Sequence, residues 1–124
     1  MATRSRIAIE NQDGTVTSIY CHFDGYLDGV GKKLFNHYDR EKTEKLIELG
    51  DISALGESIL WTIAYHRDRG EDLHSQTHSR VEALFEMDSS VDYIYCLTKD
   101  GVWLVSRFGG EAENLKEKLE EIEA

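Results

Sequence analysis

The chain has 124 residues, a formal net charge of -10 and 40% hydrophobic residues, and it contains no proline. This length supports one hydrophobic core, and this composition excludes a disordered tail, a collagen-like repeat and a pure coiled coil. No apolar run approaches the roughly 18 residues that cross a bilayer, and no signal-peptide pattern opens the chain. We therefore expect a single soluble domain over residues 1–124, located in the cytoplasm and without a membrane partner.

The charge is distributed unevenly along the chain. Acidic and basic residues cancel through Arg40, so the whole acidic excess lies from Glu41 onward. A chain this acidic repels a phosphate backbone, which disfavours direct nucleic-acid binding. The acidic half either binds a basic partner or only confers solubility. Cys21 and Cys96 both lie in apolar, strand-like runs, so we expect them to be buried free thiols.

Strand-like and helix-like patterns alternate along the chain. In chain order the expected elements are strands at 6–10 and 15–21, helices at 26–38 and 41–49, a strand at 59–65, a short helix near 79–85, strands at 93–98 and 102–108, and a helix at 111–124. Asp-Gly turns join the first two strands and the last two strands, which predicts two β-hairpins. Residues 59–65 are apolar on both faces of a strand, which is typical of a central strand. Residues 51–56 and 67–78 are expected to form loops.

Hairpins near both ends of the chain argue against a purely parallel sheet. We therefore expect an α+β fold with about five mostly antiparallel strands, in the chain order ββααβαββα, and with the helices packed on one face of the sheet.

Two short segments carry the side chains best suited to chemistry, and each repeats the pattern His-x-Asp where a predicted strand meets a loop. The candidate binding residues in them are His22, Asp24, Tyr26, His66, Arg67, Asp68 and Arg69. Residues two apart in a strand point to the same side, so each His and Asp pair could converge on one ion or substrate. If the two strand ends lie side by side, the set could hold a transition metal or act as an acid and base; otherwise the same side chains only stabilise local turns. The spacing assigns no cofactor, no catalytic residue and no particular metal.

The C-terminal segment, residues 111–124, is predicted to be an acidic amphipathic helix. Its apolar stripe either closes the sheet or packs on a second copy of the chain, which leaves a homodimer open. The carboxylates that would form a partner surface are Glu111, Glu113, Glu117, Glu120, Glu121 and Glu123.

Four blocks of the sequence resemble a group of small proteins encoded by bacteriophages and prophages. The blocks are residues 3–10, 18–26, 49–57 and 64–72, and they include the segments SIYCHFDGY and AYHRDRGED. The resemblance implies an accessory protein of a mobile element that acts in the cytoplasm of a bacterial host. Small acidic proteins of this kind are frequently inhibitors of host defence, including anti-CRISPR and anti-restriction proteins.

We therefore expect a protein that binds a basic surface of a host defence protein through its acidic half, rather than an enzyme. Two alternatives stay open. One is a small metal-dependent enzyme or nucleotide-binding sponge that uses the paired His-x-Asp elements, and the other is a structural component of an oligomer.

Overall fold

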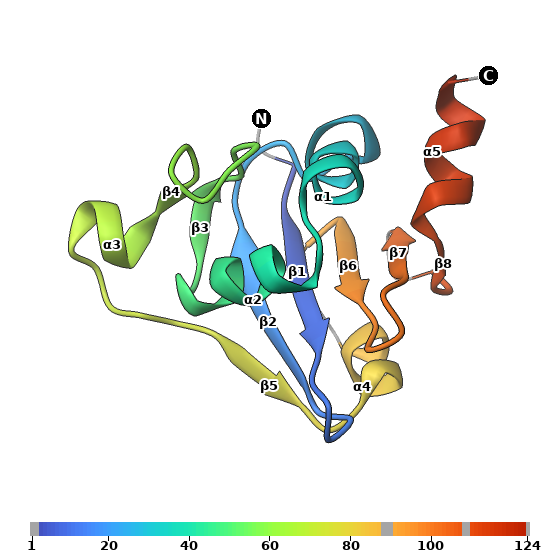
Figure 1. The fold of residues 1–124 in the computed structure, drawn as a ribbon, viewed down its shortest axis with the longest axis horizontal. Helices are drawn as coiled ribbons and strands as arrows, with labels where there is room; N and C mark the ends of the chain where they lie inside the picture. Colours follow the sequence, from blue (N-terminus) through green and yellow to red (C-terminus); the bar gives the residue numbers. More distant parts are fainter. Residues whose placement is uncertain (1–2, 88–90, 108–109, 124) are drawn as a thin grey trace.

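The computed structural model describes residues 3–87, 91–107 and 110–123, in which strands alternate with short helices (Figure 1). The strands are β1 (Ser5–Glu10), β2 (Val16–Cys21), β3 (Ile52–Ala54), β4 (Ile63–Ala64), β5 (Gln76–His78), β6 (Tyr93–Leu97), β7 (Trp103–Arg107) and β8 (Glu113–Asn114). The helices are the wide π-helical turn η1 (Leu27–Gly31), α1 (Lys32–His37), α2 (Arg40–Glu48), α3 (Tyr65–Arg69), α4 (Val81–Glu86) and α5 (Leu115–Glu123).

Local sequence signals explain the first hairpin and the second helix. Gly14 has a φ of 89°, as the tight turn between β1 and β2 requires, and Asp13 accepts hydrogen bonds from the backbone and the hydroxyl of Thr15. Asp39 caps α2, because its side chain accepts a hydrogen bond of 2.9 Å from the backbone N–H of Lys42. These elements lie where the sequence predicts them.

The strands form one mixed sheet in the spatial order β4-β3-β2-β1-β6-β7-β8 (Figure 1). β1 lies in its middle, antiparallel to β2 and parallel to β6. The free edge of β2 carries two short strands, since its end pairs in parallel with β3 and its beginning pairs antiparallel with β5. The β3–β4 hairpin therefore forms one edge of the sheet.

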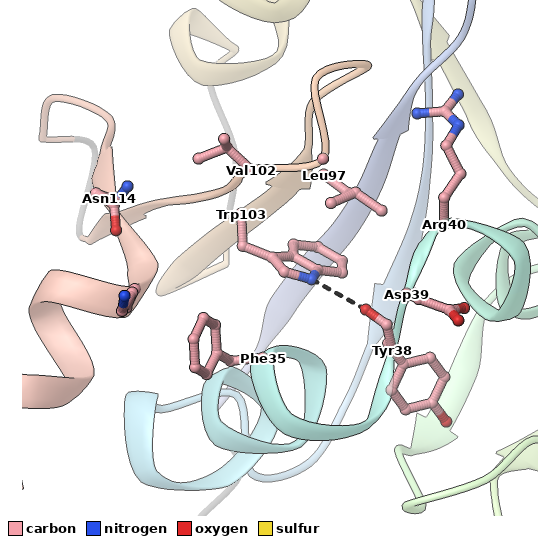
Figure 2. Close-up of a pocket in the computed structure, with 10 residues that line it drawn as sticks. Phe35, Tyr38, Asp39, Arg40, Leu97, Val102, Trp103 and Asn114 are labelled. Atoms are coloured by element: carbon pink, nitrogen blue, oxygen red, sulfur yellow. Dashed lines mark hydrogen bonds between the residues drawn. The ribbon is translucent and has the colours of Figure 1, made fainter.

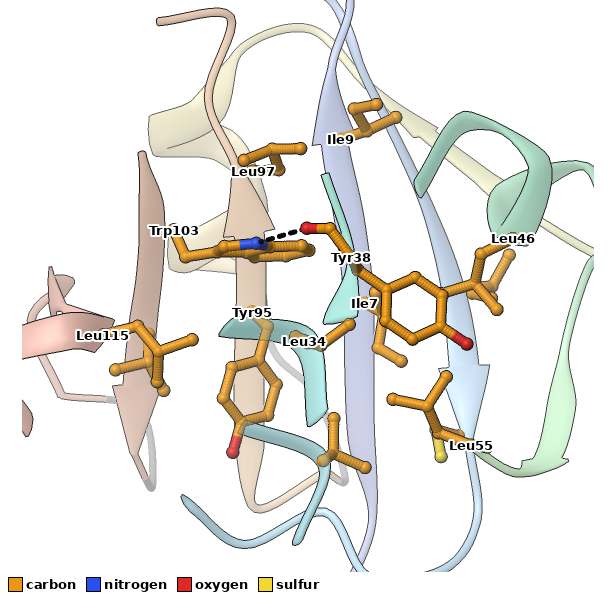
Figure 3. Close-up of a cluster of buried hydrophobic side chains, with 14 of the residues drawn as sticks. Ile7, Ile9, Leu34, Tyr38, Leu46, Leu55, Tyr95, Leu97, Trp103 and Leu115 are labelled. Atoms are coloured by element: carbon orange, nitrogen blue, oxygen red, sulfur yellow. Dashed lines mark hydrogen bonds between the residues drawn. The ribbon is translucent and has the colours of Figure 1, made fainter. Parts of the chain in front are cut away.

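The main core lies between one face of the sheet and the helical elements η1, α1, α2 and α5. Ile7, Leu34, Leu46, Tyr95 and Leu115 are fully buried there, and Figure 3 shows their side chains converging between the sheet and the helices. Leu115 belongs to the apolar stripe of the C-terminal segment, so that stripe closes the sheet.

A second, smaller cluster lies on the opposite face, where Leu84 of α4 packs against Ala8, Ile94 and Cys96. Neighbouring residues of a strand point to opposite faces, which is why Ala8 lies in this cluster while Ile7 and Ile9 lie in the main core. Helices therefore cover both faces of the sheet.

The α+β class is correct, but the predicted number of strands and their arrangement are wrong. The described residues contain eight strands in one mixed sheet rather than about five mostly antiparallel ones, and α4 packs on the face that was expected to be bare. β3, β4, β5 and β8 are each two or three residues long, too short to produce a periodic pattern. The predicted strand end at Phe108 and the helix end at Ala124 lie outside the described residues.

Residues 59–65 do not form the predicted central strand. Leu60 and Trp61 are 78% and 76% exposed, and only Ile63 and Ala64 pair with β3, at the edge of the sheet. Tyr65 then begins α3. Residues 51–56, which were expected to form a loop, instead contain β3. An apolar run fits a buried strand and an exposed turn equally well, because periodicity does not report burial.

Two further predictions can be compared with the described residues. No helix among them is long and apolar enough to cross a membrane. Cys21 and Cys96 are both buried and free, as predicted, and they lie on opposite faces of the sheet. Burial raises the pKa of each thiol to about 12, so both stay protonated at neutral pH.

A buried polar network attaches β5 to β2. The Nε atom of Arg6 donates to the hydroxyl of Ser18 at 3.0 Å, and Nε2 of His78 lies 2.8 Å from the same hydroxyl. The Ser18 hydroxyl accepts from Arg6, and its contact with Nε2 of His78 joins all three side chains in one network. Burial, and then the charge of Arg6, lower the pKa of His78.

We expect this network to make the protein less stable in mild acid. The folded-state pKa of His78 lies below the ordinary value of 6.5, so the unfolded chain binds the proton more readily. The stability is therefore complete above pH 6.5 and is lost as the pH falls below it. Urea unfolding between pH 7.5 and 5.5 should show a smaller loss for His78→Gln than for the wild-type chain. Parallel pH profiles for the two proteins would contradict this role, and His74→Gln is the matched control for an exposed histidine of the same segment.

Candidate functional site

The segment after β2 holds His22, Asp24 and Tyr26 in local contacts. Nδ1 of His22 lies 2.7 Å from the hydroxyl of Tyr20, and the Tyr26 hydroxyl donates a long hydrogen bond of 3.5 Å to Asp24. Asp24 has a φ of 59°, a left-handed conformation that short polar residues tolerate. Its carbonyl oxygen accepts a hydrogen bond of 2.8 Å from Val30, so Asp24 directs the chain into η1.

The residues of the second His-x-Asp element form most of α3. Nδ1 of His66 donates to the carbonyl oxygen of Glu71 at 2.7 Å. Asp68 accepts a hydrogen bond of 2.8 Å from the backbone N–H of Ala64 and two, of 3.0 and 2.9 Å, from Arg67. The hydrogen bonds from Arg67 lower the pKa of Asp68, and those to Asp68 raise the pKa of Arg67. The Arg69 guanidinium lies over the Tyr65 ring, 5.3 Å from its centre.

The structure does not bring the two His-x-Asp elements together. Cys21, Ile52 and Ala64 form one row across β2, β3 and β4. β2 runs parallel to β3 whereas β4 runs antiparallel to it, so His22 lies beyond the row at one end and His66 lies beyond it at the other. Among the described residues, no three His, Cys, Asp or Glu side chains are grouped closely enough to hold a metal ion.

The most exposed apolar side chains of the described structure lie at the tip of the β3–β4 hairpin. We call residues 56–62 the tip loop. Leu60 and Trp61 project from it with exposed fractions of 78% and 76%, and Ile63 directly after it is 42% exposed. Single exposed apolar residues are common on protein surfaces, whereas three large exposed apolar residues within four successive positions indicate an interaction site.

The backbone of the tip loop is fixed from within. The hydroxyl of Thr62, which is 2% exposed, donates to the Ser58 carbonyl oxygen and accepts from the Gly56 N–H, each at 3.0 Å. The Thr62 N–H also donates to the Ser58 carbonyl oxygen at 3.1 Å. The Tyr38 hydroxyl, which extends from the core, donates to the Gly56 carbonyl oxygen at 2.8 Å. Leu60 and Trp61 therefore project from a closed ring of hydrogen bonds.

Arg67 clamps the tip loop from outside. Its guanidinium donates to the carbonyl oxygens of Ile59, at 3.0 Å, and Thr62, at 2.5 Å. These two carbonyls flank Leu60 and Trp61, and Asp68 holds the guanidinium in place. Sequence reasoning selected Arg67 and Asp68 for their chemistry, whereas the structure places them as the support of an apolar surface.

Leu60 and Trp61, the residues that this support presents, were missed as candidate site residues because they were assigned to a buried strand. One signal could have identified them. Gly56 and Ser58 precede the apolar run, and both residue types favour turns over strand interiors.

The carboxylates predicted to form an acidic partner surface lie on and beside α5. Glu111, Glu117 and Glu120 are exposed and form no ion pair with the described residues, whereas Glu113 and Glu121 each lie 3.2 Å from the ammonium of Lys118. These two hydrogen-bonded contacts raise the pKa of Lys118. Glu123 ends α5, and its side chain lies outside the described part of the structure.

Comparison of the chain with protein-family models, with curated proteins and with solved structures finds no match. The resemblance to phage-encoded proteins therefore stays a prediction, and function has to be argued from geometry and charge.

Proposed function

We propose that the protein is a binding protein that inserts Leu60 and Trp61 into an apolar pocket on a basic partner protein. The observation that carries this proposal is the rigid display of the two side chains. Both are more than three-quarters exposed, while the carbonyls on either side of them are held by Arg67. A rigid loop loses little conformational entropy on binding, and tryptophan is the residue type most enriched among those that dominate interface energies.

The charge of the chain supports a basic partner. The formal net charge is -10, and Glu111, Glu117 and Glu120 on and beside α5 are exposed without ion pairs among the described residues. A field of this sign speeds the encounter with a positively charged surface and disfavours acidic competitors. In this proposal the carboxylates steer the encounter, and the tip loop sets the lifetime of the complex.

The resemblance to phage-encoded proteins extends the proposal to a class of partner. A host defence protein that binds nucleic acid has a basic surface, and an acidic protein bound there competes with the nucleic acid. We therefore propose an inhibitor of host defence of the anti-CRISPR or anti-restriction kind.

The proposal can be tested by capture followed by measurement of affinity. Immobilised wild-type chain is exposed to a bacterial lysate, and a retained basic protein is purified for titration against variants. Trp61→Ala should raise the dissociation constant of the complex with this protein about 30-fold, because loss of a dominant interface residue costs about 2 kcal/mol of binding free energy. Leu73→Ala is the matched control, since Leu73 is also exposed, at 55%, but lies outside the tip loop.

The electrostatic part has a separate readout. Glu117→Lys should lower the association rate and leave the dissociation rate nearly unchanged, and added salt should slow association to the wild-type chain. A partner that binds Trp61→Ala and wild type equally well would contradict the role of the tip loop. Binding that is insensitive to salt would contradict the role of the carboxylates.

A further inference from the structure

A hollow of about 440 Å³ lies on the helical side of the sheet, next to the β6–β7 turn (Figure 2). Phe35 of α1 and Trp103 of β7 contribute its aromatic walls, Leu97 and Val102 add aliphatic surface, and Asn114 and Lys116 border it where α5 begins. Its volume falls within the range of about 300–1,000 Å³ that small-molecule sites occupy. It is separate from the tip loop, to which none of these residues belongs.

The apolar lining of this hollow combines one buried, fixed side chain, Trp103, with two exposed ones, Phe35 and Val102. The indole N–H of Trp103 donates to the carbonyl oxygen of Tyr38 at 3.2 Å, which fixes the ring plane, and the side chain is only 6% exposed (Figure 2). Phe35 and Val102, by contrast, are 41% and 40% exposed, so the hollow presents aromatic and aliphatic surface to solvent. Such walls suit a flat ring, because aromatic rings pack favourably against one another in offset or edge-on arrangements.

The polar rim favours a negative charge. Lys116 is exposed and makes no ion pair or hydrogen bond with the described residues, so its ammonium has three donors to offer. The side-chain oxygen Oδ1 of Asn114 accepts from the backbone N–H of Glu117 at 3.1 Å, which leaves the side-chain NH₂ of Asn114 as the donor. Of the other charged groups, Asp39 caps α2, while Arg40 donates to the carbonyl oxygens of Glu10 and Thr98. Among the charged residues at this rim, Lys116 is therefore the one whose side chain has no hydrogen-bond or ion-pair partner among the described residues.

We propose that this hollow binds a small planar aromatic anion such as an aromatic carboxylate. The ring lies against Trp103 and Phe35, and the carboxylate accepts hydrogen bonds from Lys116 and Asn114. An apolar hollow bordered by an unpaired lysine favours an anion that also has an apolar body, and this local attraction acts against the repulsion from a net charge of -10.

The test uses 2-naphthoate as the probe and the two tryptophan indoles as reporters. In a ¹H–¹⁵N spectrum of the wild-type chain, the indole signal of Trp103 should shift on titration, while that of Trp61 serves as an internal reference and should not. Uncharged 2-naphthalenemethanol, of similar shape, should bind at least about tenfold more weakly, because it lacks the charge that the ammonium recognises. Lys116→Gln should weaken the binding of 2-naphthoate by a similar factor, and Phe35→Ala should also weaken its binding.

Lys45→Gln is the matched control, because Lys45 is an exposed lysine of α2 that does not border the hollow. Unchanged spectra of the folded variants, apart from local shifts, verify that Lys116→Gln and Phe35→Ala keep the fold. A Trp103 signal that does not move, or one that moves together with that of Trp61, overturns the site. Equal affinity for the charged and uncharged probes, or an equal loss with Lys45→Gln, overturns its preference for anions.

Discussion

Trp103→Ala is expected to lower the free energy of unfolding by about 3–5 kcal/mol, the range found when a large buried aromatic side chain is truncated to alanine. Trp103 is 6% exposed and belongs to the main core together with Tyr38, Leu97 and Tyr95 (Figure 3). Its truncation leaves a cavity between β7 and the end of α1 and removes the hydrogen bond to Tyr38. Since domains of this size are stable by about 5–15 kcal/mol, the variant loses a large share of its stability. Urea unfolding followed by far-UV circular dichroism measures the change.

Two neighbouring variants show whether burial is the cause. Trp103→Phe keeps most of the ring volume but has no hydrogen-bond donor for Tyr38. Its free energy of unfolding should therefore lie between that of the wild type and that of the alanine variant. Val102→Ala changes the adjacent residue, which is 40% exposed, and should alter the free energy of unfolding by less than about 1 kcal/mol. Similar losses for Val102→Ala and Trp103→Ala would mean that the indole is not part of the core in solution.

The hairpins and longer helices of this fold could be predicted because their determinants are local. Asp13-Gly14 dictates the first turn, Asp39 caps α2, and the stripe that includes Leu115 and Leu119 makes α5 amphipathic. The parallel pairing of β1 with β6 could not be predicted in the same way. It joins segments from the two ends of the chain, and their partnership depends on packing between them rather than on any pattern within either.

Sequence reasoning selected the supporting residues of the candidate site, Arg67 and Asp68, but not the apolar residues that they support. Arg67 and Asp68 attract attention because they belong to the second of the two His-x-Asp elements. Their actual partners are the backbone carbonyls of Ile59 and Thr62 and the N–H of Ala64, which become neighbours only when the hairpin closes. Trp61 was assigned to a central strand because residues 59–65 are hydrophobic. Residue type, however, indicates which side chains can be buried and does not show which of them are buried in the folded chain.

One connection between the tip loop and the main core runs through the side chain of Tyr38, and Ile59 of the loop also packs against that core. Tyr38 is buried, its backbone carbonyl accepts from Trp103, and its hydroxyl donates to Gly56. The surface proposed to bind a partner is therefore anchored to the interior of the domain rather than carried by an independent loop. The shape of the tip loop should accordingly depend on close packing at Gly56, where the chain returns against Trp61.

Gly56→Ala is expected to open the tip loop. A Cβ atom at this position would lie 2.6 Å from the carbonyl carbon of Trp61 and 2.7 Å from its carbonyl oxygen, and no rotation of a side chain relieves contact with backbone atoms. The loop must move apart, which weakens the hydrogen bond from Gly56 to Thr62 and should cost about 1–3 kcal/mol of unfolding free energy. Hydrogen exchange of the Thr62 amide should become about tenfold faster or more, since its bond to Ser58 belongs to the same ring.

Gly14→Ala separates this steric effect from the general cost of replacing a glycine. Gly14 has a φ of 89° and open space around it, so alanine there is strained by its backbone conformation but collides with nothing. That variant should lose stability without faster exchange at Thr62. If Gly56→Ala leaves the Thr62 amide as protected as in the wild-type chain, the loop is not closed as described, and the rigid display of Trp61 loses its basis. If exchange accelerates, the same variant should bind the captured partner more weakly than wild type although it retains both Leu60 and Trp61, because free energy is then spent on reordering the loop.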